Sequence, residues 1–227
     1  PMILMGIDSS TPQASVAILK NGQILSQADV DATSTVSSQI LFLIDKVLKS
    51  TDLDLMRLDG FCLTTGPGSF TGLRVGASIL KGLLLATSKP YVKIDTLEAI
   101  ALQATPTSNK ICAILDARKK EIYSAYFFEN DGVLERLTPD RALSPSQLCQ
   151  EITGPTVFIG NGLSLYGPLL TSELGRKLIL TQNKITDTVA ACAARLAESR
   201  FTTTKTKKLS NLTIKYVRKS EAELKFK

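Results

Sequence analysis

The chain has 227 residues, 44% of them apolar, which is enough for one large domain or two smaller lobes with a substantial core. Histidine is absent, which excludes Ser-His and Cys-His nucleophile pairs and every His-ligated metal site. The net charge of +6 comes from residues 201–227, where eight Lys and Arg residues stand against two Glu residues; the rest of the chain has 19 basic and 19 acidic residues.

Four cysteines are scattered along the chain without a C-x-x-C pair, so we expect reduced and mostly buried thiols. No apolar run approaches the ~20 residues that a membrane span requires, and no signal peptide is recognisable. These features predict a cytoplasmic protein that does not enter a membrane. The basic residues 201–227 could contact nucleic-acid phosphates, or they could form an ordinary solvated terminus.

The first half of the chain predicts three antiparallel strands followed by alternating helices and strands. Asn21-Gly22, between the second and third strands, is a strong hairpin signal. The first helix has an apolar face and an opposite polar side, on which Phe42 stands out. Asp95 and Glu98 form a capping pair that opens the third helix. In chain order, the predicted elements are strands at 3–7, 14–19 and 23–28, a helix at 36–49, a strand at 60–63, a helix at 70–86, a strand at 91–94 and the helix that begins at 95.

The stretch from residue 63 to residue 87 is the most distinctive part of the chain. Gly66-Pro67-Gly68 separates a strand from a helix, and Ser69 occupies a good N-cap position. The helix is apolar over most of its circumference, which is too wide for one packing partner. Gly72 and Gly76 lie one turn apart, where another backbone could approach closely. We therefore expect this helix to pack on its own sheet and on a second helix, from this chain or another.

Two interpretations of the glycine turn remain open. Gly66 and Gly68 precede a helix N-terminus, where backbone N–H groups and the helix dipole can hold an anion. Pro67 removes one donor, however, and the spacing matches neither the dinucleotide-binding nor the P-loop motif. The alternative is that these glycines only permit tight packing.

The second half of the chain repeats the pattern after a polar stretch at 104–109. An apolar strand ends in Asp116 as the first strand ends in Asp8, and a second Asn- and Gly-containing hairpin turn follows at 130–132. The predicted elements are strands at 111–115, 121–128 and 133–137, a helix at 145–152, a strand at 156–159, a helix at 163–170, a strand at 178–180 and a helix at 187–200. We expect a first lobe at 1–108, a second, reduced lobe at 109–200, and a basic tail at 201–227 that packs back on the lobes.

Two β-β-β-α-β-α lobes predict an α/β protein with the duplicated ribonuclease-H-like fold of actin, Hsp70 and sugar kinases, which bind nucleotide between their lobes. A single α/β domain with two chance-alike hairpins is the alternative. The loop Asp8-Ser9-Ser10-Thr11 has the composition of the first phosphate loop of that fold. The second lobe should offer an acid followed by glycines, but it carries Asp116-Ala117-Arg118-Lys119-Lys120.

A phosphotransferase needs both phosphate loops, so this departure predicts a degenerate nucleotide site. Asp116, Arg118 and Glu121 would fill the site and satisfy one another by charge-assisted hydrogen bonds. The alternative is that Arg118 points into solvent.

The chain resembles the TsaB (YeaZ) family over nearly its whole length. The resemblance rests on the string Thr-Gly-Pro-Gly-Ser-Phe-Thr-Gly-Leu-Arg-Val-Gly at 65–76, which is highly specific, and on four further stretches. These stretches are Met5 to Thr11, Leu115 to Arg118 with Glu121 to Tyr123, Gly160-Asn161-Gly162 and Tyr216 to Glu223.

The resemblance implies a non-catalytic partner subunit in the synthesis of threonylcarbamoyladenosine on tRNA, without a cofactor or metal of its own. Such a subunit dimerises with its catalytic paralogue TsaD through first-lobe helices, supports recruitment of the ATPase TsaE, and serves tRNA only indirectly. Without TsaD, it would self-associate through the same helices. The expected partner interface consists of Phe42, Ser69, Phe70, Gly72, Leu73, Arg74, Gly76 and Leu80. The loop residues Asp8, Ser9, Ser10, Thr11, Gly66 and Gly68 would be the remnant of a nucleotide site.

One departure and one rival function accompany this resemblance. Many relatives carry a His-Ser pair near the start of the first helix, where this chain has Ser37-Ser38. The rival function is that of a small ATP-dependent phosphotransferase or ATPase of the actin-like fold, with Asp8 orienting a metal-bound water.

Overall fold

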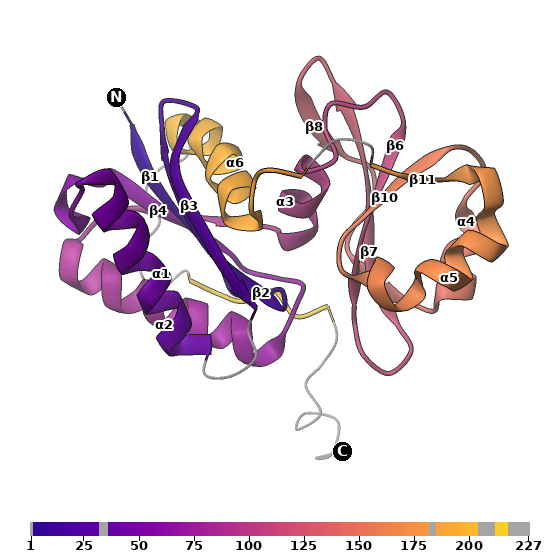
Figure 1. Ribbon diagram of the computed structural model, residues 1–227, viewed down its shortest axis with the longest axis horizontal. Helices are drawn as coiled ribbons and strands as arrows, with labels where there is room; N and C mark the ends of the chain where they lie inside the picture. Colours follow the sequence, from indigo (N-terminus) through magenta and orange to yellow (C-terminus); the bar gives the residue numbers. More distant parts are fainter. Residues whose placement is uncertain (1, 32–35, 182–184, 204–211, 218–227) are drawn as a thin grey trace. The chain divides into compact units, whose positions relative to one another are not determined.

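The computed structural model describes residues 2–31, 36–181, 185–203 and 212–217, which belong to two compact units (Figure 1). Unit 1 comprises residues 1–99 and 187–215, and unit 2 comprises residues 100–186 and 216–227. The predicted boundary at residue 108 is therefore moved to residue 99. The prediction that the last helix belongs to the second lobe is wrong, because this helix packs on the sheet of unit 1.

Unit 1 contains a five-stranded mixed sheet. The first three strands form an antiparallel meander, and the turn at Asn21-Gly22 has positive φ at both residues, as a tight hairpin requires. The fourth and fifth strands lie on the other side of the first strand and run parallel to it. In the spatial order β3-β2-β1-β4-β5, the strands are β3 (Gln23–Asp31), β2 (Gln13–Lys20), β1 (Ile3–Asp8), β4 (Gly60–Thr64) and β5 (Tyr91–Ile94).

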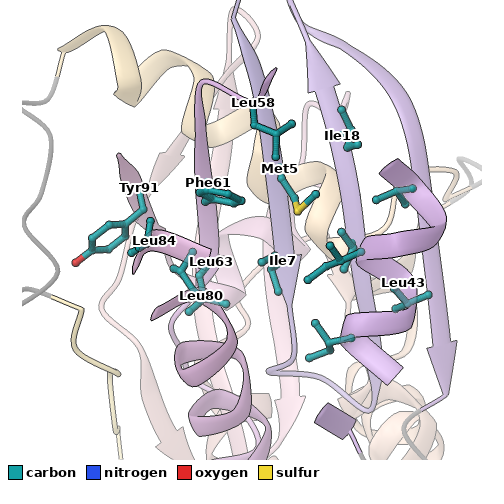
Figure 2. Close-up of a cluster of buried hydrophobic side chains, with 14 of the residues drawn as sticks. Met5, Ile7, Ile18, Leu43, Leu58, Phe61, Leu63, Leu80, Leu84 and Tyr91 are labelled. Carbon is teal, nitrogen blue, oxygen red and sulfur yellow. The ribbon is translucent and has the colours of Figure 1, made fainter. Parts of the chain in front are cut away.

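Helices cover both faces of this sheet (Figure 1). Helices α1 (Val36–Thr51) and α2 (Phe70–Thr87) contact each other on one face, and α6 (Val189–Thr203) covers the other. Figure 2 shows the core beneath α1 and α2, where Leu43 of α1 and Leu80 of α2 meet Met5 and Phe61 of the sheet. The two other elements are the 3₁₀ segment η1 (Leu55–Arg57) and helix α3 (Thr96–Leu102), whose first residues, up to Ala99, belong to unit 1.

A row of alanines lets α6 approach the sheet closely. Ala190, Ala193 and Ala194 are fully buried, and a Cβ placed on Gly6 of β1 would overlap the carbonyl oxygen of Ala190. At the far end of α6, Arg200 forms an ion pair with Glu98 of α3. The side chain of Glu98 thus pairs with Arg200, and the cap is provided by Asp95, whose Oδ1 accepts from the backbone N–H of Leu97 at 3.0 Å.

Helix α2 is also long and apolar enough, by length and composition alone, to cross a membrane. In the structure it is a core helix of unit 1, and Leu73, Leu80 and Leu84 are buried in that unit. The sequence analysis predicted no apolar run long enough for a membrane span. Residues 70–87 do meet the criteria of length and composition, but the helix packs on a sheet.

Unit 2 repeats the strand arrangement of unit 1. Strand β6 is antiparallel to β7 and parallel to β10, just as β1 is antiparallel to β2 and parallel to β4. The spatial order is β11 (Leu178–Leu180), β10 (Thr156–Ile159), β6 (Lys110–Asp116), β7 (Ile122–Asn130) and β8 (Val133–Arg136). This repetition confirms the predicted duplicated α/β fold.

The remaining elements of unit 2 are helices α4 (Pro145–Glu151) and α5 (Gly162–Leu174), the 3₁₀ segment η2 (Gly175–Lys177) and strand β9 (Arg141–Leu143). The sequence does not predict β9, which pairs with β7. Its Arg141 forms a bidentate ion pair with Glu151 of α4, at 2.9 and 2.7 Å. This pair joins a short strand, too short for a periodic signal, to the helix that covers the sheet.

Candidate functional site

The carboxylate of Asp8 lies at the end of β1 and is fully buried. One carboxylate oxygen, Oδ1, accepts from the backbone N–H of Ser10 at 3.0 Å and from the hydroxyls of Ser10 and Thr64, both at 2.5 Å. The other oxygen, Oδ2, accepts from the hydroxyl of Thr11 at 2.8 Å. Four donors of the chain itself therefore satisfy the charge of Asp8.

The glycine turn closes over this loop. The Gly66-Pro67 peptide bond is cis, and Gly66 has φ = +118°. The backbone N–H of Ser69, at the start of α2, donates to the carbonyl oxygen of Ser10 at 2.8 Å. A Cβ on Gly68 would overlap that same carbonyl oxygen. The turn is thus packed against the chain itself, and a backbone donor that an anion would need is directed at Ser10.

The first two turns of α2 continue this contact. Ser69 caps the helix by accepting from the N–H of Gly72 at 3.2 Å, as predicted. The hydroxyl of Ser9 donates to the carbonyl of Gly72 at 2.8 Å, and a Cβ on Gly72 or Gly76 would overlap atoms of Ser9. The close approach expected between α2 and a second helix is therefore made by the Asp8 loop of the same unit.

This arrangement corrects half of the expected partner interface. Gly72, Leu73, Gly76 and Leu80 are buried inside unit 1, so they are not surface residues that a partner could touch. Ser69, Phe70 and Arg74 are exposed. The sequence pattern misassigned the four buried residues because the surface at Gly72 and Gly76 also fits the loop that contains Ser9, 63 residues before Gly72 in the chain.

The exposed residues of the two helices form a surface that we call the α1–α2 face. It includes the predicted Phe42, whose side chain is 64% exposed, and Phe70, whose ring lies 3.8 Å from the guanidinium carbon of Arg74. It also includes Leu41 and Leu85, which is 73% exposed and which the sequence analysis missed. Leu85 follows the exposed Lys81 by one helical turn, so the spacing from a charged residue was the signal that could have indicated an exposed leucine.

The second predicted loop has an unusual backbone. Arg118, Lys119 and Lys120 all have positive φ, at 62°, 52° and 62°, a conformation that favours glycine. The loop is held by backbone N–H groups: that of Arg118 donates to Asp116 Oδ1 at 2.8 Å, and that of Asp116 donates to Asn161 Oδ1 at 3.1 Å. The chain thus keeps a glycine-like loop path while bearing three long basic side chains.

The expected cluster of Asp116, Arg118 and Glu121 is corrected in one respect. The side chain of Arg118 is exposed, as in the alternative interpretation, and Asp116 is engaged by backbone groups. The hydroxyl of Tyr166 donates to the carbonyl oxygen of Glu121 at 3.4 Å, and partial burial, together with the nearby Asp116 and Glu121, raises the pKa of Tyr166. Tyr166, absent from the predicted site, therefore supports this loop from α5.

Residues 212–215 form a further part of the first site that the sequence analysis did not place. The N–H of Lys215 donates to the carbonyl of Thr65 at 2.8 Å, and Lys215 Nζ pairs with Asp95 at 2.9 Å. A Cβ on Gly66 would overlap the carbonyl oxygen of Lys215. Leu212 is buried in the core of unit 1. The start of the basic tail is thus anchored beside the glycine turn, while residues 218–227 lie outside the described residues.

Comparisons with known proteins agree with this architecture. The structure resembles that of a Pseudomonas aeruginosa protein described as similar to peptidase YeaZ, with a TM-score of 0.82 and 20% identity, covering 96% of this chain and 100% of that one. It also resembles the activator of the 2-hydroxyisocaproyl-CoA dehydratase from Clostridium difficile with bound ADPNP, with a TM-score of 0.56 and 14% identity, covering 91% of this chain and 100% of that one. Both likenesses concern the fold.

Sequence comparisons identify the family. The model of a family described as "TsaD: tRNA N6-adenosine threonylcarbamoyltransferase" matches residues 30–225. The tRNA threonylcarbamoyladenosine biosynthesis protein TsaB of Haemophilus influenzae is 29% identical over 184 residues, which cover 76% of this chain and 78% of that protein. The chain therefore belongs to the TsaD family and, within it, to the TsaB (YeaZ) proteins.

Proposed function

We propose that this chain is a non-catalytic subunit of the cytoplasmic machinery that synthesises threonylcarbamoyladenosine on tRNA. It binds the catalytic paralogue TsaD through the α1–α2 face, and the resulting pair recruits the ATPase TsaE; contact with tRNA is indirect. Family membership supports the pathway. The observation that carries the binding role is the exposed apolar surface of the two helices, with Phe42 at 64% and Leu85 at 73% exposure.

Exposed aromatic and leucine side chains on adjacent helices are typical of protein–protein contacts. They do not contribute to the core of unit 1, and water must be removed from them when a partner binds. Phe42 lies in the middle of α1, and its neighbours on the helix include buried residues such as Leu43 that hold the helix on the sheet. A partner would therefore meet a rigid surface and lose little entropy on binding.

The state of the phosphate loop supports the absence of catalysis. Asp8 is saturated by hydroxyl and N–H donors of its own unit, and the N–H of Ser69 is directed at a carbonyl group. A metal-bound water or a phosphate would have to displace these groups. In unit 2, the corresponding loop carries Arg118, Lys119 and Lys120 instead of glycines. A phosphoryl-transfer site requires positioned donors on both sides of the phosphate, and neither loop offers them in this conformation.

The binding role is tested with Phe42→Ala. Truncating an interface aromatic residue that acts as a hot spot costs ~2 kcal/mol or more, so the Kd for TsaD from the same organism should rise about 30-fold. Phe128→Ala is the matched control, because Phe128 is an exposed aromatic residue of β7 in unit 2. Titration calorimetry measures both variants, and pull-down of TsaE by the mixture measures recruitment. Equal affinities for the parent and Phe42→Ala would remove this face from the interface.

The rival enzyme function is tested with Asp8→Asn. We expect no ATP hydrolysis above background by the pure chain, and no change in the variant, because Asp8 serves the loop rather than a substrate. The variant should instead lose ~1.5–3 kcal/mol of unfolding free energy, since hydrogen bonds to a buried charge are replaced by bonds to a neutral amide. A coupled ATPase assay and urea denaturation measure the two effects. Turnover by the parent that the variant abolishes would establish the rival function.

A further inference from the structure

The loop between β6 and β7 ends in a turn whose residues conflict with its backbone. The N–H of Glu121 donates to the carbonyl of Arg118 at 3.0 Å, and this bond closes a four-residue turn with Lys119 and Lys120 at its centre. Both central residues have positive φ, at 52° and 62°. Two lysines therefore occupy a backbone conformation for which Asn and Gly are strongly preferred.

The same chain forms two other turns of this kind with the preferred residues. Asn21-Gly22 has φ values of 47° and 76°, and Asp131-Gly132 has values of 50° and 77°. Outside the β6–β7 loop, every non-glycine residue with positive φ in the part of the chain that the structure describes is Asn, Asp or Ser. In this loop, by contrast, three residues with long side chains adopt positive φ in succession, because Arg118 at 62° precedes the two lysines.

These residues make the turn less stable than an Asn-Gly turn would be. A Cβ atom in the left-handed region crowds the following carbonyl group, whereas glycine has no Cβ and asparagine tolerates the conformation. Two bonds that hold the loop, from the N–H of Arg118 to Asp116 Oδ1 and from the N–H of Ala117 to the carbonyl of Glu121, involve no basic side chain. Positions that break a local rule are typical of functional sites, so the conflict indicates a use for the basic side chains themselves.

The chemistry of the loop favours carboxylates of a protein over nucleic-acid phosphates. The side chains of Arg118, Lys119 and Lys120 are exposed, and the half-buried Asp116 and Glu121 flank them. A nucleic-acid strand carries a phosphate at every nucleotide and would meet these two carboxylates as well as the cations. A protein can place single carboxylates opposite the cations, and a guanidinium binds a carboxylate through two parallel N–H groups.

We infer that the turn at Arg118, Lys119 and Lys120 is a docking site for a segment of a partner protein that carries closely spaced carboxylates. This site lies in unit 2 and is separate from the α1–α2 face, so the inference goes beyond the proposed function and does not depend on it. Because backbone hydrogen bonds fix the turn, less conformational entropy is lost when a partner binds to it.

The cost of the two lysines is tested with the double variant Lys119→Asn, Lys120→Gly, which gives this turn the residues of the turn at 21–22. The melting temperature should rise by about 2–4 °C, because the backbone conformation stays and its steric conflict is removed. Thermal unfolding followed by circular dichroism measures the shift. An unchanged or lower melting temperature would show that the lysines cost nothing, and would overturn the argument for a functional turn.

Binding is tested with an acetylated and amidated hexaglutamate peptide at low salt. Exposed ion pairs contribute modestly, so Lys119→Asn, Lys120→Gly should weaken the affinity of the full chain for the peptide about fivefold. The matched control is Lys207→Asn, Lys208→Gly, which removes an adjacent lysine pair from the basic residues 201–227 and should change the affinity less than twofold. Titration calorimetry compares the three proteins. Equal losses in the two variants would mean that the peptide responds only to total charge, and no docking site would remain.

A hexauridylate RNA in the same titrations separates the two classes of partner. We expect the parent to bind it more weakly than hexaglutamate, with little difference between the parent and the turn variant. RNA that binds more tightly than the peptide, and that loses more affinity than the peptide does in the turn variant, would assign the turn to phosphate groups and refute the acidic protein partner.

Discussion

Gly72 and Gly76 illustrate how single positions determine what α2 can contact. Both lack a side chain on the surface that meets Ser9, and the Ser9 hydroxyl donates to the carbonyl of Gly72. Gly82, two turns further along the same helix, has open space around it. The three glycines therefore have different consequences, although the sequence presents them alike: two permit a contact, and the third only weakens the helix.

Gly72→Ala and Gly82→Ala should accordingly change stability in opposite directions. At Gly72, the added methyl group overlaps a backbone carbonyl oxygen, so we expect a loss of ~1–3 kcal/mol, as for other overpacked sites. At Gly82, alanine meets nothing and improves helix propensity, so we expect a gain of ~0.5–1 kcal/mol. Urea denaturation measures both. A stabilised Gly72→Ala variant would contradict the close contact with Ser9.

Helix α2 shows how an element can be predicted correctly while its surroundings are not. Its start at Phe70, its cap at Ser69 and its wide apolar surface follow from the sequence. The apolar width predicts more than one packing partner, but not which ones. In the structure, the sheet, α1 and the Asp8 loop share this surface. The residues left over, including Arg74 and Leu85, are those exposed to solvent.

The segment at 212–215 is a second element whose role depends on contacts distant in sequence. Leu212 and Ile214 alternate with polar residues, which suits an extended segment with one buried side. The segment crosses the end of β4 and the glycine turn, where Lys215 bonds to Thr65 and Asp95. It therefore holds the turn from which α2 begins.

Leu212→Ala should destabilise unit 1. Truncating a buried leucine removes apolar contact and leaves a cavity, at a cost of ~2–5 kcal/mol, and the lower end is expected beside a segment that can adjust. Leu165→Ala is the control, because Leu165 of α5 is 60% exposed and should change stability by less than ~0.5 kcal/mol. Thermal unfolding followed by circular dichroism compares the two. Identical melting temperatures would mean that residues 212–215 are not anchored in solution.

At the scale of the whole molecule, the duplication was predictable, but the division of the chain was not. Each half carries its own strand-then-acid start at Asp8 and Asp116 and its own hairpin turn, and these local signals suffice for the repeat. Whether α6 belongs to unit 1 or to unit 2 depends on which sheet leaves room for its buried alanines. Gly6 of β1 provides that gap, a match between two residues over 180 positions apart that periodicity cannot reveal.

Some features of the candidate site could likewise be predicted from the sequence, and others could not. The acid and hydroxyl residues of the first loop and the exposed Phe42 could be named from composition and pattern. The partners of Asp8, especially Thr64, depend on the pairing of β1 with β4 and could not. Likewise, the left-handed backbone of Arg118 to Lys120 is adopted by residues that do not favour it, so their sequence hides it.

A chain that ends at residue 108 should therefore fail to fold cooperatively. It contains the whole sheet of unit 1 but lacks α6 and residues 212–215, so one face of the sheet stays uncovered. A peptide of residues 187–217 added in trans should restore a cooperative urea transition, and the same peptide with Ala194→Leu should not, because Ala194 is fully buried against Gly6. Cooperative unfolding of the shorter chain alone would contradict this dependence.

The return of α6 to unit 1 also affects the order in which the protein can be completed on the ribosome. The sheet of unit 2 is formed by one continuous stretch of sequence, from β6 to β11. Unit 1, in contrast, also needs residues 187–215, which are synthesised after that stretch. During translation, the β1–β5 sheet therefore emerges first and is finished last, with an apolar face uncovered while all of unit 2 is synthesised. The α1–α2 side of that sheet is complete much earlier, so a nascent chain can present the α1–α2 face, which we propose to bind a partner, before its own fold is closed.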